Sequence, residues 1–291
     1  MVPQHLKNVI QRINDLPTLP RTILRISELV NNPKTSAKDL AKVITDDQVL
    51  TARLLKLVNS SFYGFPQKIS TVTGAIVLLG FDAIRNLLLT TSVFDLFSNK
   101  YKANKELQEK FWDHSLGCAI GAKAIGGFLK SEQVEELFVA GLLHDIGKIV
   151  EMMIMPQEFE QAVQKTRDEP ITIYQAEEQV LGFTHTEVGR LLAEKWNLPT
   201  KLSHIIAHHH HPIKAGRFVD ETAVVHVADI FCRALGLGSG GDERMTPLDM
   251  EVWGRFNFSS QVIDYLLQEI DQTFSDISSV LVATKAAEHS I

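Results

Sequence analysis

Residues 137–145 read LFVAGLLHD, so seven apolar residues run directly into a histidine and an aspartate. An ionised aspartate at the end of such a run is costly to bury unless a cation meets it. A metal ion would meet that need. The stretch therefore predicts a core segment that delivers His144 and Asp145 to a bound cation.

Helix-initiation signals lie on both sides of this stretch. Polar residues with the spacing of N-terminal caps occur at Ser36 with Asp39, at Thr184 with Glu187, and at Thr246 before Asp249, each followed by apolar residues at helical period. No segment shows the alternating pattern of a convincing β-strand. The sequence predicts an all-α fold, a multi-helical bundle with a central metal pocket.

Two apolar stripes in the N-terminal third carry the helical period. The first comprises Leu50, Leu54, Leu57 and Val58, and the second begins with Ala75, Ile76, Leu78 and Leu79 before Gly80. Such faces usually pack inward. We expect both stripes to be core and not a surface for a partner.

Composition is that of an ordinary globular protein. The 291 residues are 45% hydrophobic and 22% charged, which suffices for one large core or two modest ones. The formal net charge of -6 argues against a general nucleic-acid binder, because phosphate neutralisation requires clustered lysines and arginines. Residues 1–10 lack the apolar core of a signal peptide, and no apolar run approaches the roughly 18 residues of a membrane helix. We expect a cytoplasmic protein with no membrane partner.

The two cysteines, Cys118 and Cys232, lie far apart in helical, apolar surroundings. Their spacing suggests neither a disulfide framework nor a thiolate metal site. We expect two buried free thiols in a reducing compartment.

A polar segment at 99–105 predicts a boundary between helical parts. We expect an N-terminal helical part at 1–100, a second part at 106–235 that contains every candidate ligand, and a loop with C-terminal helices at 236–291. The glycine-rich residues 236–241 resemble a phosphate loop only superficially, because the preceding strand and the lysine are missing. A flexible surface loop is the better interpretation.

Histidines are frequent in this chain, which has 11, and a single one on an apolar helix face is usually a hydrogen-bonded core residue. Seven residues carry more weight as a set: His114, His144, Asp145, His185, His209, His210 and Asp229. Imidazole and carboxylate groups bind divalent cations, and helices can direct such groups into one pocket. The sequence leaves open whether His204, His208 and His226 cap a helix, support a metal ligand or simply pack in the core. His5 and His289 lie near the ends of the chain and are expected to be exposed.

Several motifs in the first 90 residues occur in the order found in a known family. They are LPTLP at 16–20, ITDDQVL at 44–50, LLKLVNSSFYG at 54–64 and AIVLLG at 75–80. Together they closely resemble the HDOD domain of bacterial signalling proteins, and the chain up to about residue 235 is similar to the rest of that domain. The resemblance implies an all-helical module related to the HD superfamily of metal-dependent phosphohydrolases, which includes the HD-GYP phosphodiesterases.

The HD superfamily pattern can be carried onto this chain position by position. It falls on His114 in WDHS, His144 and Asp145 in HDIGK, His185 in FTHTEVG, His209 and His210 in IIAHHHHP, and Asp229 in VAD. The run of four histidines leaves the register open by one residue, and the distance to Ile206 and Pro212 favours the middle pair. HDOD proteins are usually thought to have lost these ligands, so their retention is a departure from that family's expectation.

The same resemblance implies how the ligands divide between two ions. Asp145 is the natural bridge because a carboxylate has two oxygens. His114, His144 and Asp229 complete one ion, and His185, His209 and His210 complete the other. Two such ions can share an activated water and clamp a phosphoryl oxygen. Lys148, one turn beyond Asp145, becomes a candidate phosphate anchor, with an exposed lysine facing water as the alternative.

Two departures from the HD-GYP enzymes narrow the expected chemistry. Position 110 is lysine where the trinuclear enzymes carry a metal-binding glutamate, so no third ion is expected. Residues 211–216 read HPIKAG and lack the Gly-Tyr-Pro signature, which argues against cyclic dinucleotide cleavage. The histidine-rich ligand set favours transition metals, with iron or manganese preferred over zinc.

Two functions are compatible with these patterns. We expect a cytoplasmic signal-transduction module of the HDOD type that retains a dinuclear metal site and binds a signalling protein partner, in an oligomeric state that the sequence leaves open. The alternative is a metal-dependent phosphohydrolase or phosphodiesterase that acts on a nucleotide or another small phosphoester, with Asp145 as the metal bridge in the catalytic centre. Turnover of a phosphoester distinguishes the two.

Overall fold

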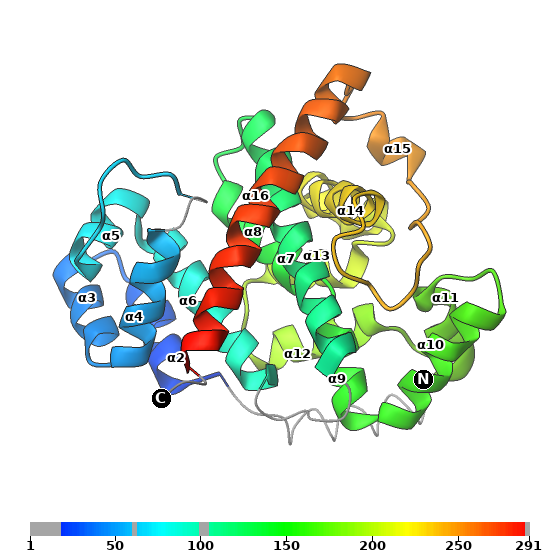
Figure 1. Ribbon diagram of the computed structural model, residues 1–291, viewed down its shortest axis with the longest axis horizontal. Helices are drawn as coiled ribbons and strands as arrows, with labels where there is room; N and C mark the ends of the chain where they lie inside the picture. Colours follow the sequence, from blue (N-terminus) through cyan, green and yellow to red (C-terminus); the bar gives the residue numbers. More distant parts are fainter. Residues whose placement is uncertain (1–18, 60–62, 99–104, 289–291) are drawn as a thin grey trace. The chain divides into compact units, whose positions relative to one another are not determined.

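The computed structural model describes residues 19–59, 63–98 and 105–288, and these residues form helices joined by loops, without a β-strand among them (Figure 1). The predicted all-α fold is confirmed. Contacts group the described chain into two compact units, a larger one within 100–270 and a smaller one within 19–99 and from 271 onward. Residues 16–18, 60–62, 99–104, His5 and His289 of the sequence-based predictions lie outside the described residues.

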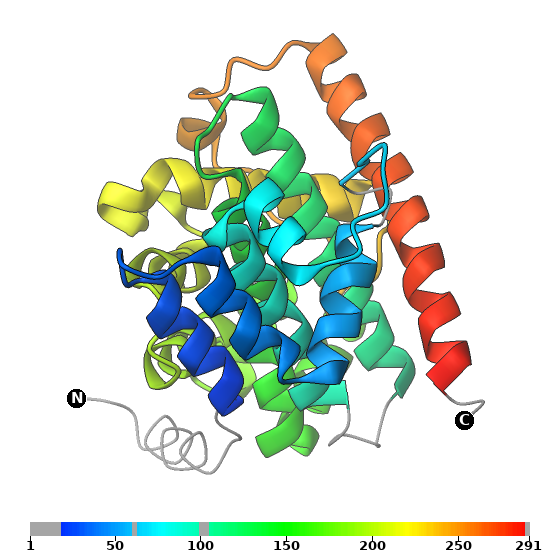
Figure 2. The same cartoon turned by 90° about the vertical axis from the view of Figure 1, so that its left-hand side faces the viewer.

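The smaller unit is built mainly from consecutive helices, which are coloured blue to cyan in Figure 2. They are α2 (Arg21–Val30), α3 (Ala37–Thr45), α4 (Gln48–Val58), α5 (Val72–Leu79) and α6 (Phe81–Ser98). Helix α2 packs on α3 and α6, and α5 packs on α3, α4 and α6. The predicted cap at Ser36 forms a full capping box with Asp39, which satisfies two backbone N–H groups at the start of α3.

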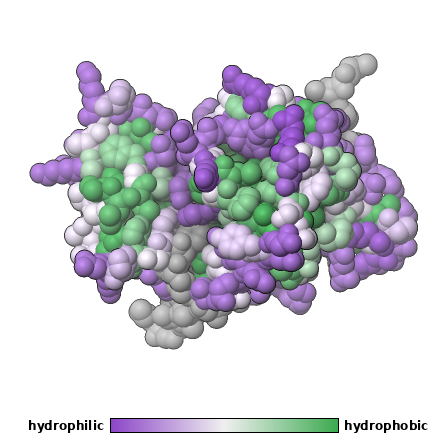
Figure 3. Space-filling model, turned by 90° about the horizontal axis from the view of Figure 1, so that it is seen from above, coloured by the Kyte–Doolittle hydropathy of each residue, from purple (hydrophilic) through white to green (hydrophobic). Residues whose placement is uncertain are grey.

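The two predicted stripes lie on α4 and α5. Within them Leu50, Leu54, Val58, Ala75 and Ile76 are buried, and Leu57 is half-buried. Leu78 is 58% exposed, which corrects its assignment to the core. The buried face of this eight-residue helix is centred on Val72 and Ile76, and at about 100° per residue Leu78 points away from it. Figure 3 shows hydrophobic surface on this unit, in the left-hand part of the view.

The larger unit holds most of the remaining helices. They are α7 (Lys105–Phe128), α8 (Val134–Leu143), α9 (Ile146–Ile154), α10 (Pro156–Asp168), α11 (Ile173–Val180), α12 (His185–Lys195), α13 (Thr200–His208), the 3-10 helix η1 (Pro212–Phe218), α14 (Val219–Ala234) and α15 (Met250–Trp253). Helix α7 packs along α8 and α14, and α12 packs on α9 and α13. A last helix, α16 (Ser260–Glu288), belongs to this unit up to Ile270.

The run at 137–143 forms α8, and all seven of its residues are buried. Gly141 has a specific reason to be glycine, because a Cβ there would collide with the backbone of Cys118 and Ala119 in α7. Gly147, at the start of α9, is constrained in the same way by the backbone of His185 at the start of α12. These two close approaches bring the turn at 144–145 against both α7 and α12.

Two local predictions need correction. Thr246 does not cap α15; Asp249 accepts the N–H groups of Glu251 and Val252, while the Thr246 hydroxyl donates to Asp229. The predicted surface loop at 236–241 packs on α7, where the N–H of Ser239 donates to the carbonyl of Lys110 over 3.0 Å. Glycine permits this contact, since a Cβ at Gly238 would meet the α7 backbone. Among the described residues, no single helix has both the length and the apolar composition to cross a membrane.

Candidate metal centre

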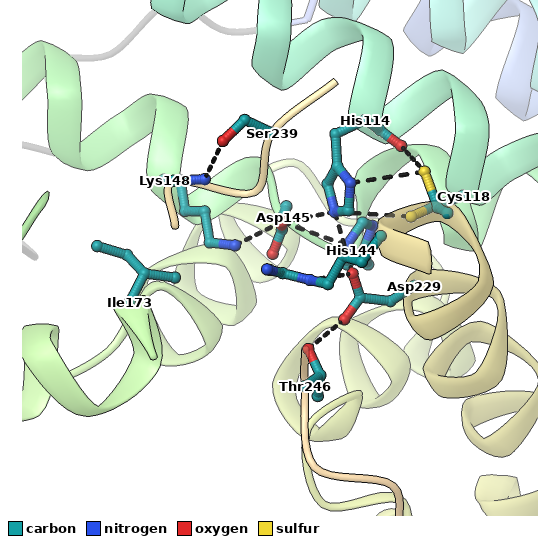
Figure 4. Close-up of polar contacts among 12 residues, drawn as sticks. His114, Cys118, His144, Asp145, Lys148, Ile173, Asp229, Ser239 and Thr246 are labelled. Carbon is teal, nitrogen blue, oxygen red and sulfur yellow. Dashed lines mark hydrogen bonds and ion pairs between the residues drawn. The ribbon is translucent and has the colours of Figure 1, made fainter. Parts of the chain in front are cut away.

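The seven predicted ligand residues converge at one place inside the larger unit, although they come from five segments of the chain. Figure 4 labels four of them, namely His114, His144, Asp145 and Asp229. Helix α7 supplies His114, the α8–α9 turn supplies His144 and Asp145, and α12 begins with His185. The turn after α13 supplies His209 and His210, and α14 supplies Asp229. Six of the seven are at most 3% exposed, and His210 is partly exposed. The polar groups therefore line a mostly buried site.

The first group of side chains in this pocket contains His114, His144 and Asp229. His114 Nε2 lies 3.1 Å from Asp229 Oδ1. Cys118, which the sequence analysis did not expect in a metal site, joins the same group, and one donor atom from each of the four residues lies within 4.8 Å of every other. These atoms are close enough to share one ion.

The second group contains Asp145, His185, His209 and His210. His185 Nε2 is 3.2 Å from Asp145 Oδ1, 3.4 Å from His209 Nε2 and 3.1 Å from His210 Nε2. The ring of His208 lies beside that of His204 instead, and His204 also packs on Phe218. The middle pair of the four-histidine run is thus the pair directed at the pocket.

The carboxylate of Asp145 lies between the two groups. Its Oδ2 is 3.6 Å from His114 Nε2 and 3.3 Å from His144 Nε2. Its Oδ1 faces the second group, at 3.2 Å from His185 Nε2 and 3.5 Å from His209 Nε2. Each oxygen therefore faces a different group, as a bridging carboxylate requires.

The spacing of the donor atoms fits metal coordination. Two nitrogens bound tetrahedrally at typical bond lengths of about 2.05 Å lie about 3.3 Å apart. Distances of 3.1 to 3.5 Å within the second group match this separation. In addition, His144 Nε2 and Asp145 Oδ1 are buried and have no hydrogen bond of acceptable geometry among the described residues. Such buried polar atoms call for a partner, and a cation supplies one.

Hydrogen bonds on the far side of three imidazoles aim them at the pocket. The Nδ1 of His144 lies 2.6 Å from the carbonyl oxygen of Gly141, and that of His209 lies 3.0 Å from the carbonyl oxygen of Ile206. The Nδ1 of His185 lies 2.6 Å from Glu177 Oε2. With Nδ1–H as the donor in each case, Nε2 keeps its lone pair for an ion, as in many metal-binding histidines.

His226 has a supporting position that the sequence left open. Its Nδ1 donates to the carbonyl oxygen of His209 over 2.8 Å, and its Nε2 accepts the N–H of Asp249 over 3.1 Å. This buried ring therefore connects α14 to the end of α13 and to the residue that caps α15. It fixes the backbone that carries His209.

Electrostatics divides the histidines into two kinds. Burial lowers the pKa of His209 to about 3 and the pKa of His210 well below its usual range, so both rings are neutral near pH 7. Burial opposes protonation of His114 as well, but Cys232 and Asp229 raise its pKa to about 9. Without an ion, a proton on His114 compensates the carboxylates, and that proton must leave when a metal binds.

Lys148 is fully buried, which rules out the exposed alternative. Its Nζ donates to Asp145 Oδ2 over 2.6 Å. Burial opposes ionisation of Asp145, but the neighbouring His144 and Lys148 hold its pKa well below the usual range. One turn further along α9, burial and Glu177 raise the pKa of Glu151 well above its usual range.

Asp229 is held in place by a polar network on the other side of the pocket. Its Oδ1 accepts from Arg233 Nε over 2.9 Å, and its Oδ2 accepts the Thr246 hydroxyl over 2.7 Å. Arg233 also donates to Asp242, whose second oxygen accepts the N–H of Ile173. Burial opposes ionisation of Asp229, but Arg233 and His114 keep its pKa well below the usual range.

We expect metal-free protein to lose stability as the pH falls below about 6.5, in part because of His209. Its pKa is about 3 in the folded chain and 6.5 in the unfolded chain, so between these values the unfolded state binds more protons. The stability contributed by the neutral His209 ring is fully present above pH 6.5 and is lost as the pH falls towards 3. From pH 7 to pH 5, the loss in the free energy of unfolding amounts to about 2 kcal/mol.

Thermal melts in a chelator at pH 7, 6 and 5 measure this effect. The variant His209→Asn has no titrating ring, so its stability should depend less on pH than that of the wild type. Identical pH dependence in the two proteins would contradict the assignment of a neutral, buried His209.

Arg233 and Glu177 escaped the sequence analysis, and Cys118 was expected to be a free thiol outside any metal site. Cys118 follows His114 by four residues and Arg233 follows Asp229 by four, so helical spacing was an available signal for both. Glu177 precedes His185 by eight residues across the α11–α12 turn, and no regular period connects them. Only the folded chain reveals that contact.

Comparisons with known proteins cover most of the chain. The HDOD domain family model matches residues 16–212. An HDOD domain protein from Geobacter sulfurreducens is 30% identical, with a TM-score of 0.78 over 94% of this chain and 97% of that one. A protein from Marinobacter aquaeolei whose name includes the words signal transduction is 21% identical, with a TM-score of 0.75 over 94% of this chain and 64% of that one.

A curated relative from Treponema pallidum is 26% identical over 203 residues, which are 70% of this chain and 39% of that protein. The match thus spans about two fifths of the relative's length. The family match covers well over half of the present chain, and the Geobacter structure is similar along nearly its whole length. The chain therefore belongs to the HDOD domain family.

Proposed function

We propose that this protein is an HDOD signal-transduction module that holds two divalent transition-metal ions in its larger unit and presents a metal-stabilised helical surface to a signalling protein partner. The observation that carries the dinuclear site is the position of Asp145. Its two carboxylate oxygens face separate groups of histidines, at 3.2 to 3.6 Å. A single ion would leave one of these groups without a cation.

The ligand arrangement supports a role in organising the unit. The donors come from α7, the α8–α9 turn, α12, α13 and α14, which are segments far apart in the sequence. Metal binding would connect them at one point and would add its binding free energy to the stability of the folded state. Metal occupancy could thereby control whether the unit has the shape that a partner recognises.

Two features favour a module over an enzyme. Three of the ligand residues, His114, His144 and His185, are fully buried. The ammonium group of Lys148, the candidate phosphate anchor, already donates to Asp145. A substrate phosphate would have to displace that contact and reach side chains that are fully buried.

Phosphoester hydrolysis is the second candidate, and His210 is the observation that favours it. This ligand is partly exposed, and its ring lies against Tyr174, which also contacts His211, at the open side of the second group. When bound, a pair of divalent cations supplies Lewis acidity and an activated water for attack on phosphorus. His210 and Tyr174 would orient a phosphoester that enters beside Tyr174.

A panel of phosphoesters separates the two candidates. Protein loaded with Mn(II) or Fe(II) would be incubated with nucleoside monophosphates, cyclic nucleotides and aryl phosphates, with Asp145→Ala as the control. Metal-loaded protein that leaves the whole panel intact supports the signalling module. Turnover that disappears in Asp145→Ala overturns the module proposal in favour of the hydrolase.

Metal removal is expected to lower the melting temperature. An ion present at about 100 times its dissociation constant stabilises the folded state by about 2.7 kcal/mol, and at about 2–4 °C per kcal/mol chelation should lower Tm by about 5–10 °C. Differential scanning calorimetry before and after EDTA, followed by re-addition of Mn(II), measures this shift. A Tm that does not respond to either step would show that no ion supports the fold.

A further inference from the structure

The thiol of Cys118 lies inside the candidate metal centre. Cys118 is fully buried, and its Sγ is 3.7 Å from His114 Nε2, the ring nitrogen that also faces Asp229 and Asp145 (Figure 4). Both residues belong to α7 and are one turn apart, so the helix directs their side chains to the same side. The thiol is therefore part of the pocket wall at the first group.

The distances suit a shared ion. A nitrogen and a sulfur bound tetrahedrally, at about 2.05 and 2.3 Å from zinc, lie about 3.6 Å apart, and a nitrogen and an oxygen lie about 3.4 Å apart. The corresponding distances are 3.7 Å from His114 Nε2 to Cys118 Sγ and 3.1 Å from His114 Nε2 to Asp229 Oδ1. These two distances are close to those expected for ligands of one ion.

A second observation is independent of the cysteine. His144 arrives from the end of α8, is fully buried, and leaves its Nε2 without a hydrogen bond among the described residues. That atom belongs to the same set as Cys118 Sγ, in which the donor atoms are all within 4.8 Å of one another. An ion bound by both residues would give His144 Nε2 the partner that it lacks and would have Cys118 Sγ as a second ligand.

We propose that Cys118 binds, as a thiolate, the ion that His114, His144 and Asp229 hold. This inference rests on the proposed metal centre and makes its two sites chemically different. The first site offers sulfur, nitrogen and oxygen, whereas the second offers only nitrogen and oxygen. As the sulfur–metal bond forms, the S–H bond breaks and its proton passes to solvent, and no oxidant or reductant takes part.

The difference predicts metal preference. Thiolate is a soft ligand that favours zinc and ferrous iron over manganese. With the bridging oxygen of Asp145, the first ion would have one sulfur, two nitrogens and two oxygens as neighbours. The second site, with histidines and the bridging carboxylate, suits manganese or iron. The protein would then be selective for different metals at two positions a few ångströms apart.

Cys232 provides a matched control because it touches the opposite side of the same imidazole. Its Sγ is 3.6 Å from His114 Nδ1, 3.5 Å from the carbonyl oxygen of His114 and 3.4 Å from that of Leu237. It is buried and free, as is Cys118. Cys232 therefore supports the ring of His114, while Cys118 faces the donor atoms.

The test uses Co(II) as a spectroscopic probe in the full chain. Cobalt bound by a thiolate has an intense sulfur-to-metal charge-transfer absorption in the near ultraviolet, and cobalt bound by histidine and carboxylate alone does not. We expect the absorption in the wild type and in Cys232→Ser, and its loss in Cys118→Ser, together with at least about tenfold weaker binding of one cobalt equivalent. Absorption retained in Cys118→Ser and lost in Cys232→Ser would overturn the assignment.

X-ray absorption of the Zn(II)-loaded wild type keeps the inference testable if Cys118→Ser does not fold. A sulfur neighbour at about 2.3 Å from zinc is the expected result. Zinc bound with only nitrogen and oxygen neighbours would overturn the role of Cys118 and leave the metal centre intact. Failure of the wild type to bind cobalt or zinc at all would instead overturn the proposed metal centre and the cysteine assignment with it.

Discussion

Asp145→Ala is expected to abolish metal binding at both groups and to destabilise even the metal-free protein. The substitution removes the only carboxylate among the predicted ligands whose two oxygens face different groups. It also leaves the fully buried ammonium of Lys148 without its 2.6 Å partner. Breaking a buried ion pair by deleting one partner typically costs about 3–5 kcal/mol. Metal analysis and chemical denaturation in a chelator measure the two effects.

Asp145→Asn separates these effects. The amide oxygen can still accept a hydrogen bond from Lys148, so metal-free Asp145→Asn should be more stable than metal-free Asp145→Ala. The amide lacks the negative charge and the second oxygen of a bridging ligand, so both variants should bind little metal. An Asp145→Ala protein that keeps its metal and its stability would contradict the position assigned to this residue.

Arg233→Ala is expected to destabilise the larger unit by about 3–5 kcal/mol, because it strands a buried charge. The guanidinium group is 7% exposed and lies 2.9 Å from both Asp229 and Asp242. Without Arg233, the buried carboxylates of Asp229 and Asp242 lose the positive charge that compensates them. Asp229 would also lose the contact that holds its Oδ1 towards His114. Urea denaturation in a chelator measures the stability, and metal titration measures the effect on the first group.

Arg255→Ala is the matched control. Arg255 also forms an arginine–aspartate pair, with Asp220 at 2.7 Å, but its side chain is 44% exposed and that of Asp220 is 78% exposed. Exposed pairs of this kind contribute about 0–1 kcal/mol. Similar losses in Arg233→Ala and Arg255→Ala would show that burial of the first pair does not have the importance we assign to it.

The sequence predicts the helical fold and all seven residues that converge at the pocket. Helical periodicity and capping are local signals, so the all-α class and the caps at Ser36 and Thr184 follow from residues near one another in the chain. The resemblance to the HD superfamily adds long-range information. It relates His114 to Asp229 without any local signal that would connect them.

Contacts across the fold explain what the sequence did not predict. Lys148 is buried because Asp145 pairs with its charge, and a local pattern cannot distinguish that lysine from an exposed one on the same helix. Glu177 reaches His185 from another helix, and the loop at 236–241 packs on α7 through small residues that resembled a flexible linker. In each case the deciding interaction depends on helix packing.

The presence of bound metal tests the central claim most directly. The chain would be purified without an affinity tag, exchanged into chelator-free buffer, and examined by elemental analysis alongside Asp145→Ala. We predict about two transition-metal ions per wild-type chain, the number that two ligand groups joined by one carboxylate can hold. A metal content near zero in the wild type, even after incubation with Mn(II), Fe(II) or Zn(II), would contradict the account.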